Sequence, residues 1–519
     1  MQERSIAGIV ALLLLLWACG SSSAQPSLPE GLPPATPPPA SQPATQPSGP
    51  ALPEGLGPPG DQPALPGGLP GGDQPSLPGG LPGGDQPALP GGLAASQPAT
   101  RPATQPAKTF LQSVKDMGLT GFWETRGGVR TQHPAGQRQA SLGETRFQLD
   151  WEKHFKGDWT AHVVADFLYD AVDEHHTVDL ERGRGWLDLR QANVSFRPLK
   201  WLDVRAGRQI LTWGTGDLLF INDLFPKDFV SFFLGRDEEY LKVPSDAIKL
   251  SAYSDLANLD VVYTPRFDPD RFISGRRLSF FNPLAGRVVG REQTLSSEIP
   301  ARWFQNDEWA ARLYKTIEGY ELAAYGYWGY WKSPGGVNPF RGEAIFPRLN
   351  VYGGSARGPL LKGIGNVELG YYDSRNDRHG NNPFINNSQF RILGGYEQDL
   401  PQIATDLTVS MQYELDVTAH HSRLVRALPP GAPEPDELRH VLTWRVTKKL
   451  LNQNLTVGLF VFYSPSDGDA YFRPKVHYKI DDQWSVEVGG NVFVGRENYT
   501  LFGQFERDSN VYTALRYGF

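Results

Sequence analysis

Segments in which apolar and polar residues alternate follow one another from about Leu111 to the end of this 519-residue chain. In Asp406–Asp416, for example, Thr408 and Gln412 share one face. The other face carries Leu407, Val409, Met411, Tyr413 and Leu415. A period of two residues is typical of β-strands with one apolar and one polar face, and about eighteen such segments can be counted. We therefore predict an all-β protein.

The connections between these segments alternate in length. Lys156–Asp158 and Arg197–Lys200 are short, whereas Gly214–Ser245 and Pro265–Gln305 are long. Transmembrane barrels have short periplasmic turns, longer outer loops and an apolar face that meets lipid, and a soluble sandwich has no reason to follow this alternation. We predict a transmembrane antiparallel up-and-down β-barrel of about 18 strands, with about 16 as the alternative, and with both barrel termini on the periplasmic side.

Aromatic residues near the strand ends agree with a membrane barrel. Trp123, Trp186 and Trp331 are among the rings expected in two interfacial girdles. The chain ends in V-Y-T-A-L-R-Y-G-F, and the alternation places Tyr517 and Phe519 on the lipid face. This strand resembles the C-terminal signal of bacterial outer-membrane proteins. The resemblance implies the barrel-assembly machinery as a partner, together with outer-membrane lipid and lipopolysaccharide.

The barrel is predicted to occupy residues 109–519, and residues 1–24 have the charged start and apolar core of a secretory signal. Cleavage after Ala24 and lipidation of Cys19, which follows L-W-A, are two alternatives for its processing. Residues 25–108 repeat a Pro- and Gly-rich unit. This composition predicts a disordered linker, and attachment of the linker to the cell wall is a more specific alternative.

Composition excludes several classes of protein. The single Cys excludes a disulfide framework and a Cys-rich metal site. A net charge of −7 offers no case for nucleic-acid binding. His420 and His421 lie in a predicted loop, without the nucleophile pattern of a hydrolase. We therefore expect a protein that is not an enzyme and that uses no cofactor and no metal.

The polar face of the barrel should line the lumen, and part of that face is basic. In Ala470–Ile480 the apolar side chains alternate with Arg473, Lys475, His477 and Lys479. The other candidate pore-lining residues are Arg205, Gln209, Arg445 and Arg516. A ring of Lys and Arg favours anions, whereas inward glutamates such as Glu414 and Glu487 would cancel part of the field.

The third outer loop, Gly214–Ser245, is predicted to fold into the lumen and to narrow it. Its apolar residues, which include Phe225, Phe232 and Phe233, need cover that an inward fold would supply. A basic wall opposite the acids of the loop would create a transverse field. An inert capping loop is the alternative. The acids of this candidate constriction are Asp217, Asp223, Asp228, Asp237, Glu238 and Glu239.

The sequence G-R-Q-x-x-x-W-G, at Gly207–Gly214, with Asp217, Asp223 and Pro226 after it, resembles a poorly characterised proteobacterial porin-like family. Alginate-export barrels are a more distant comparison. The resemblance implies a barrel that transports solutes and fixes no substrate. We predict a porin-like channel for diffusion or export of small hydrophilic solutes, with anions as one candidate class. An envelope-anchored structural or adhesive barrel and a polysaccharide exporter are the alternatives, and the oligomeric state stays open.

Overall fold

A computed structural model describes residues 118–134, 136–173 and 177–519 of the chain. The predicted signal segment, residues 1–24 with Cys19, and the predicted linker, residues 25–108, lie outside the described residues.

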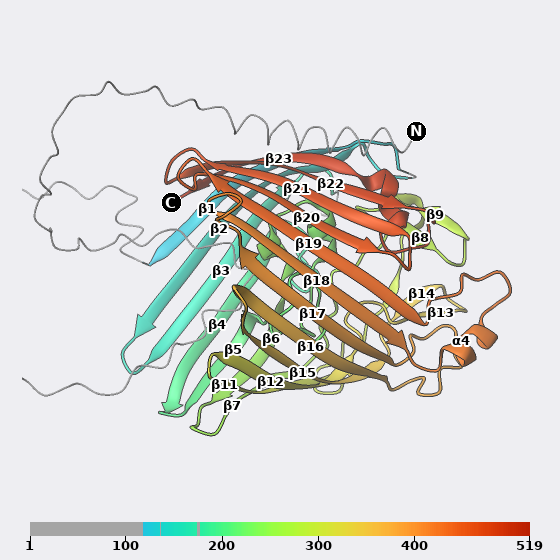
Figure 1. Cartoon of the computed structure of the whole chain (residues 1–519), viewed down its shortest axis with the longest axis horizontal. Helices are drawn as coiled ribbons and strands as arrows, with labels where there is room; N and C mark the ends of the chain where they lie inside the picture. Colours follow the sequence, from blue (N-terminus) through green and yellow to red (C-terminus); the bar gives the residue numbers. More distant parts are fainter. Residues whose placement is uncertain (1–117, 135, 174–176) are drawn as a thin grey trace, which may run out of the picture. The chain divides into compact units, whose positions relative to one another are not determined.

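Eighteen strands form one antiparallel sheet that closes on itself (Figure 1). Each strand pairs with the next one along the chain, and the last pairs with the first. This closure confirms the predicted barrel and its strand number. The strands are β1 (Leu119–Arg130), β2 (Ala140–Phe155), β3 (Trp159–Asp170), β4 (Leu187–Leu199), β5 (Leu202–Ile210), β6 (Pro244–Ala252), β7 (Asn258–Thr264), β11 (Glu308–Ile317), β12 (Tyr320–Tyr330), β15 (Arg348–Leu360), β16 (Gly363–Ser374), β17 (Gln389–Asp399), β18 (Leu407–Thr418), β19 (Leu438–Leu450), β20 (Leu455–Ser464), β21 (Asp469–Lys479), β22 (Trp484–Gly495) and β23 (Asn510–Gly518).

The C-terminal strand is held along its length by β1. The register runs from Phe122 opposite Gly518 to Arg130 opposite Asn510. Phe519 continues the pairing through a hydrogen bond of its backbone N–H to the Gly121 carbonyl oxygen (3.0 Å), and its ring stacks on Phe147 at 5.7 Å between centroids. The terminus is therefore part of the barrel seam.

The two faces of the barrel differ in the way the alternation predicts. On β1, Trp123 points outward and is 39% exposed, whereas Glu124 and Arg126 point inward and are 4% and 2% exposed. The same contrast recurs on β23, where Val511 and Leu515 are exposed and Tyr512 is buried. An apolar outside around a polar inside is the pattern of a transmembrane barrel. In the described part of the chain no helix is long and apolar enough to cross a membrane.

Long loops gather at one end of the barrel and short turns at the other (Figure 1). The C-terminus lies at the short-turn end. The predicted girdle position of Trp331 is wrong, because this side chain is 7% exposed and packs inside the barrel. The loops carry the small elements α3 (Phe229–Leu234), η1 (Glu238–Leu241), β8 (Phe280–Asn282), β9 (Arg287–Val289), η2 (Arg291–Gln293), β10 (Ser297–Glu298), β13 (Gly336–Asn338), β14 (Glu343–Ile345), α4 (His421–Ala427) and η3 (Gly503–Asp508).

Candidate functional site in the lumen

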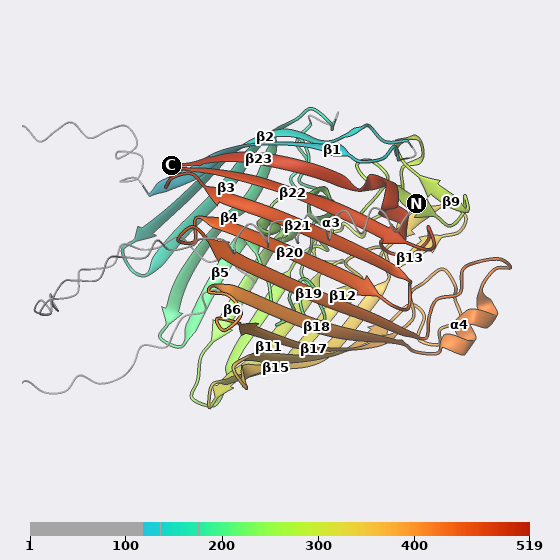
Figure 2. The same ribbon diagram turned by 45° about the horizontal axis from the view of Figure 1, so that its top comes forward.

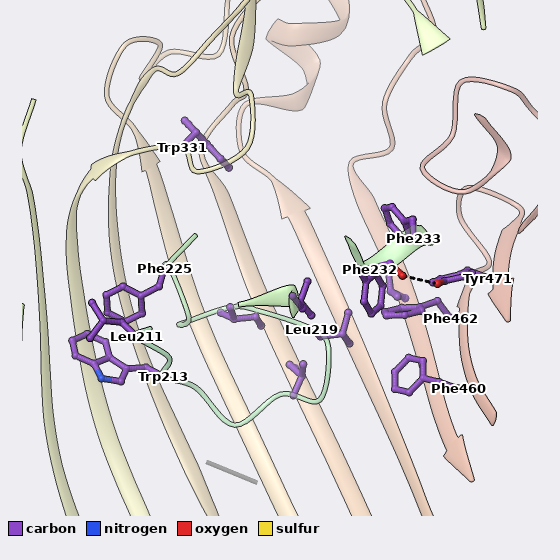
Figure 3. Close-up of a cluster of buried hydrophobic side chains, with 14 of the residues drawn as sticks. Leu211, Trp213, Leu219, Phe225, Phe232, Phe233, Trp331, Phe460, Phe462 and Tyr471 are labelled. Carbon is purple, nitrogen blue, oxygen red and sulfur yellow. Dashed lines mark hydrogen bonds between the residues drawn. The ribbon is translucent and has the colours of Figure 1, made fainter. Parts of the chain in front are cut away.

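The segment 211–243, which we call the lumen loop, connects β5 to β6 and passes through the inside of the barrel (Figure 3). Its centre is the short helix α3. Asp228 caps the start of α3 by accepting a hydrogen bond from the Ser231 backbone N–H (2.7 Å). Gly235 ends the helix in the left-handed region, at φ 88°. These caps stabilise one turn of apolar helix in the middle of the loop.

The lumen loop reaches the wall opposite its own strand. Round the ring, β19 is nine strands from β5 in either direction. Arg445 on β19 donates two hydrogen bonds to Asp217, from Nε to Oδ2 (2.6 Å) and from Nη2 to Oδ1 (2.9 Å). A two-point guanidinium–carboxylate contact fixes orientation as well as distance. The loop therefore spans the lumen.

Glu368 on β16 holds the first half of the lumen loop. This side chain is 1% exposed. Its Oε1 accepts hydrogen bonds from the hydroxyl of Thr215 (2.9 Å) and from the Gly216 backbone N–H (2.8 Å). Its Oε2 accepts from the backbone N–H (3.2 Å) and the amide nitrogen (2.9 Å) of Asn222. One buried carboxylate thus satisfies donors on both sides of a bend in the loop.

The second half of the lumen loop is anchored by aromatic packing. Phe232 and Phe233 of α3 are each 5% exposed. Tyr471 on β21 lies 5.8 Å and 5.5 Å from these two rings, between centroids. Phe462 on β20 contacts Phe232 (Figure 3). Phe493 on β22 contacts Phe233, at 5.7 Å between ring centroids. Figure 2 shows α3 behind these strands. These aromatic contacts hold the loop against the part of the wall that β20, β21 and β22 form.

The acids that follow α3 contact the basic residues of the wall directly. Glu238 lies 3.4 Å from Arg445 and 3.2 Å from Arg473. Arg516 on β23 lies 3.5 Å from Asp237 and 3.4 Å from Glu239. Burial alone would raise the pKa of Glu238, but the arginines Arg445 and Arg473 outweigh it and lower the pKa to about 2. Glu238 is therefore charged at neutral pH.

The expected transverse field requires a correction. It assumed that the acidic loop and the basic wall face each other across open space, whereas Asp217, Asp237, Glu238 and Glu239 are paired with arginines of that wall. Contact between opposite charges cancels most of the field between them. The expectation failed because the loop extends as far as the opposite wall. The sequence pattern does not determine how far a loop extends.

Two predicted constriction acids have local roles instead. Asp223 accepts a hydrogen bond from the Thr212 hydroxyl (2.7 Å) and pairs with Lys227 at 3.0 Å. Asp228 caps α3 and lies 3.4 Å from Arg271 of a neighbouring loop. Both stabilise the lumen loop and neither contacts the basic strands.

The remaining predicted pore-lining residues are spread over the inner wall. Gln209 is fully buried and donates to the Ala247 carbonyl oxygen (2.9 Å), and Lys475 pairs with Glu487 at 3.4 Å. Arg205 donates to the Ser195 hydroxyl (3.0 Å) and stays exposed. His477 and Lys479 are partly exposed. That these side chains line a conducting pore stays a prediction.

Inward charges on the first strands belong to the same network and were missed in the sequence. Arg236 of the lumen loop pairs with Glu144 on β2 at 2.7 Å, and Arg126 on β1 pairs with Glu487 at 3.0 Å. The only signal in the sequence was the position of these residues on the polar face of alternating strands. Taken singly, a residue on that face cannot be told from one that is solvated by water in the lumen. Glu368 was missed for this reason too.

A second long loop, residues 265–307, which we call the mouth loop, leaves β7 and is fixed to the loops and strand ends around β1–β3 and β23. Gln137 donates to the Gly275 carbonyl oxygen (2.7 Å), and Asp508 accepts from the Ser279 backbone N–H (2.9 Å). Arg277 pairs with Asp170 and donates to the Ser141 carbonyl oxygen (2.9 Å). No cluster of three or more His, Cys, Asp or Glu suited to a metal occurs among the described residues.

Comparison with known proteins found no matching family model and no matching curated protein. Solved structures do match. OccAB1 of Acinetobacter baumannii has 10% identity and a TM-score of 0.44, and the match covers 77% of this chain and 95% of that chain. OccK2 (OpdF) of Pseudomonas aeruginosa, in complex with glucuronate, has 11% identity and a TM-score of 0.45, covering 77% and 97%. Salmonella typhi OmpF, in complex with daunomycin, has 10% identity and a TM-score of 0.37, covering 77% and 97%. Similarity this low carries no argument about function.

Proposed function

We propose that this protein is a porin-like channel of the outer membrane, through which small hydrophilic solutes cross by passing the lumen loop. The observation that carries the proposal is a closed barrel with charged inner side chains and one loop that reaches the opposite wall through Asp217 and Arg445. A barrel of about 18 strands is wide enough to leave an aqueous channel.

The proposed location is the outer membrane of a Gram-negative cell, with the short turns and both barrel ends in the periplasm. The predicted secretory signal and the C-terminal strand ending in Phe519 support this location. The connections are short at one end of the barrel and long at the other. This difference supports the proposed orientation, because periplasmic turns are short in such barrels and outer loops are long. Lipid, lipopolysaccharide and the barrel-assembly machinery remain the proposed partners, and cell-wall attachment through residues 25–108 remains a proposal too.

Charge selectivity should be modest. The arginines nearest the lumen loop are paired with its acids, which removes most of their attraction for solute anions. Toward the short-turn end of β5 and β21, Arg205 is exposed and His477 and Lys479 are partly exposed. We therefore propose a mild preference for anions, weaker than a basic wall without the loop would give.

One observation favours a second candidate function. The mouth loop is fixed across the long-loop end by Arg277 and Asp508, and a nearby hairpin carries Phe340 at 97% exposure. A covered barrel with an exposed aromatic tip suits an envelope-anchored adhesive or structural protein.

Single-channel recording in a planar bilayer distinguishes the two candidates. The full chain is refolded, and a salt gradient gives the reversal potential. Open steps with a slight anion-directed reversal potential would support the channel. Silence from a barrel that is folded by heat-modifiable gel mobility would reject it and favour the adhesive alternative.

A further inference from the structure

Three neighbouring turns at the short-turn end of the barrel each carry an exposed aliphatic side chain. These turns connect β15 to β16, β17 to β18 and β19 to β20. The side chains are Leu361, Ile403 and Leu451, which are 91%, 66% and 63% exposed. We call these three residues the turn row. Because the barrel covers so little of their surface, they contribute almost nothing to its own packing.

The backbone at two positions of the turn row is unfavourable for leucine. Leu361 has a φ of 54° and Leu451 a φ of 51°. This left-handed region is rarely adopted by residues with a large apolar side chain, and glycine and asparagine are the residues that suit it. The turns themselves therefore do not require leucine, and an apolar contact outside the barrel gives leucine a role at both positions.

Residues 61–93, which lie outside the described residues, carry matching apolar groups. This segment contains two leucines in each 12-residue repeat, and all but the last of these leucines precede a proline. They are Leu65, Leu69, Leu77, Leu81, Leu89 and Leu93. Proline has no backbone N–H, so a Pro-rich segment leaves few backbone donors unsatisfied when it packs on an apolar surface.

The spacing of these leucines fits the spacing of the turns. Successive turns at one end of a barrel are two strands apart, which is about 12 Å for strands about 4.8 Å apart and tilted by about 40°. The two leucines of a repeat are four residues apart. A polyproline II chain rises about 3.1 Å per residue, so four residues of it also span about 12 Å. One repeat therefore matches two neighbouring turns.

The segment is attached at the same end of the barrel as the turn row. The first described residue is Gly118, and β1 begins directly after it, at the end where the short turns and the C-terminus lie (Figure 1). Leu93 precedes Gly118 by 25 positions. A Pro-rich connection of that length spans up to about 80 Å, whereas a barrel of this strand number is roughly 35 Å across. Every turn at this end is within reach.

Charge does not oppose such a contact. The three turns and the strand ends beside them, residues 358–365, 398–408 and 447–456, contain three lysines and two aspartates. The lysines are Lys362, Lys448 and Lys449, and the aspartates are Asp399 and Asp406. Residues 61–93 contain one aspartate in each repeat and no basic residue.

We propose that the turn row binds the Leu-Pro repeats of residues 61–93 in the same chain and holds this segment against the short-turn end of the barrel. The inference goes beyond the proposed channel function and does not depend on it. Burial of the leucines of the repeats against the three side chains of the turn row supplies the attraction. A tether to the cell wall would then start near residue 61 instead of residue 118, which shortens its reach.

Photo-crosslinking of the full chain, with one barrel in each lipid nanodisc, tests the proposal. p-Benzoylphenylalanine takes the place of Leu361 in one protein. In the control it takes the place of Phe340, which is 97% exposed at the long-loop end. Mass spectrometry of the digested protein locates the crosslinks. We expect crosslinks from position 361 to residues 61–93, and none to that segment from position 340.

A double variant tests the other two members of the turn row. Ile403→Asn with Leu451→Asn removes their apolar side chains, and the barrel should still fold because asparagine suits the left-handed φ at position 451. The crosslinking yield from position 361 to residues 61–93 should fall several-fold. Leu256→Asn makes the same kind of change at an 82% exposed leucine outside the turn row, and it should leave the yield unchanged.

Two outcomes would overturn the proposal. One is that position 361 crosslinks to lipid alone or gives no crosslink to residues 61–93, which would assign the turn row to the membrane interface. The other is an equal yield with and without the double substitution in folded protein. Because crosslinking needs no current, a silent bilayer together with these crosslinks would reject the channel and keep the contact.

Discussion

At the scale of single residues, Glu368 shows how much of the lumen loop depends on one side chain. Its carboxylate accepts hydrogen bonds from Thr215, Gly216 and Asn222, and the side chain is only 1% exposed to solvent. Glu368→Gln leaves one oxygen to accept and sets an amide NH₂ against N–H donors. We expect the free energy of unfolding to fall by about 2–3 kcal/mol. Urea titration of protein in lipid vesicles measures it.

The matched control is Glu318→Gln, at an exposed position in the β11–β12 turn. Its free energy of unfolding should change by less than about 0.5 kcal/mol. Equal effects of the two variants would contradict the role of Glu368.

Glu238 gives the lumen loop a defined dependence on pH. Its pKa is lowered from 4.5 to about 2 in the folded protein, so its stabilising contribution is complete above pH 4.5 and disappears as the pH falls toward 2. We expect the single-channel conductance to change over this range as the loop loosens. The pKa of Asp237 is lowered from 3.8 to about 2, so its contribution is lost within the same range, between pH 3.8 and 2.

The double variant Asp237→Asn, Glu238→Gln should therefore have a nearly flat conductance between pH 4.5 and 2. The measurement is the single-channel conductance of the wild type and of the double variant, recorded in the same salt at each pH. A variant as pH-sensitive as the wild type would show that other groups loosen the loop.

At the scale of elements, α3 acts as an aromatic anchor. Phe→Ala substitutions in packed clusters cost about 3–5 kcal/mol, so Phe233→Ala should detach α3 from Tyr471 and Phe493. We expect faster cleavage within 211–243 in limited proteolysis and a larger open-channel current. Phe340→Ala, at 97% exposure, is the control and should change neither.

The strands were predictable from sequence, whereas the contacts of the lumen loop were not. Each strand of a membrane barrel can be identified from its own residues. Apolar and polar residues alternate along it, because one face meets lipid and the other faces the lumen. The burial of the apolar residues around Phe232 could be expected from composition. The pairing of Asp217 with Arg445 joins residues 228 positions apart and depends on the path of the whole loop.

At the scale of the whole molecule, the sum of charges in the lumen should decide ion selectivity. Asp217→Asn combined with Glu238→Gln would leave Arg445 and Arg473 without their partners on the loop. The reversal potential in a salt gradient should then move toward the value for anions. Asp436→Asn with Glu437→Gln changes the same charge on an exposed outer loop and should have little effect.

Closure of the ring through β1 and β23 makes the order of strands along the chain partly arbitrary. Because Phe519 is hydrogen-bonded to Gly121, a short peptide can join residue 519 to residue 118, and the tight β20–β21 hairpin can be opened in their place. Such a circular permutant keeps every strand pair but ends on a different strand. We expect the permutant to refold in detergent but to fail to assemble in cells. That result would show that the strand pairing determines the barrel, whereas the C-terminal position of the strand that ends in Phe519 determines its assembly in the membrane.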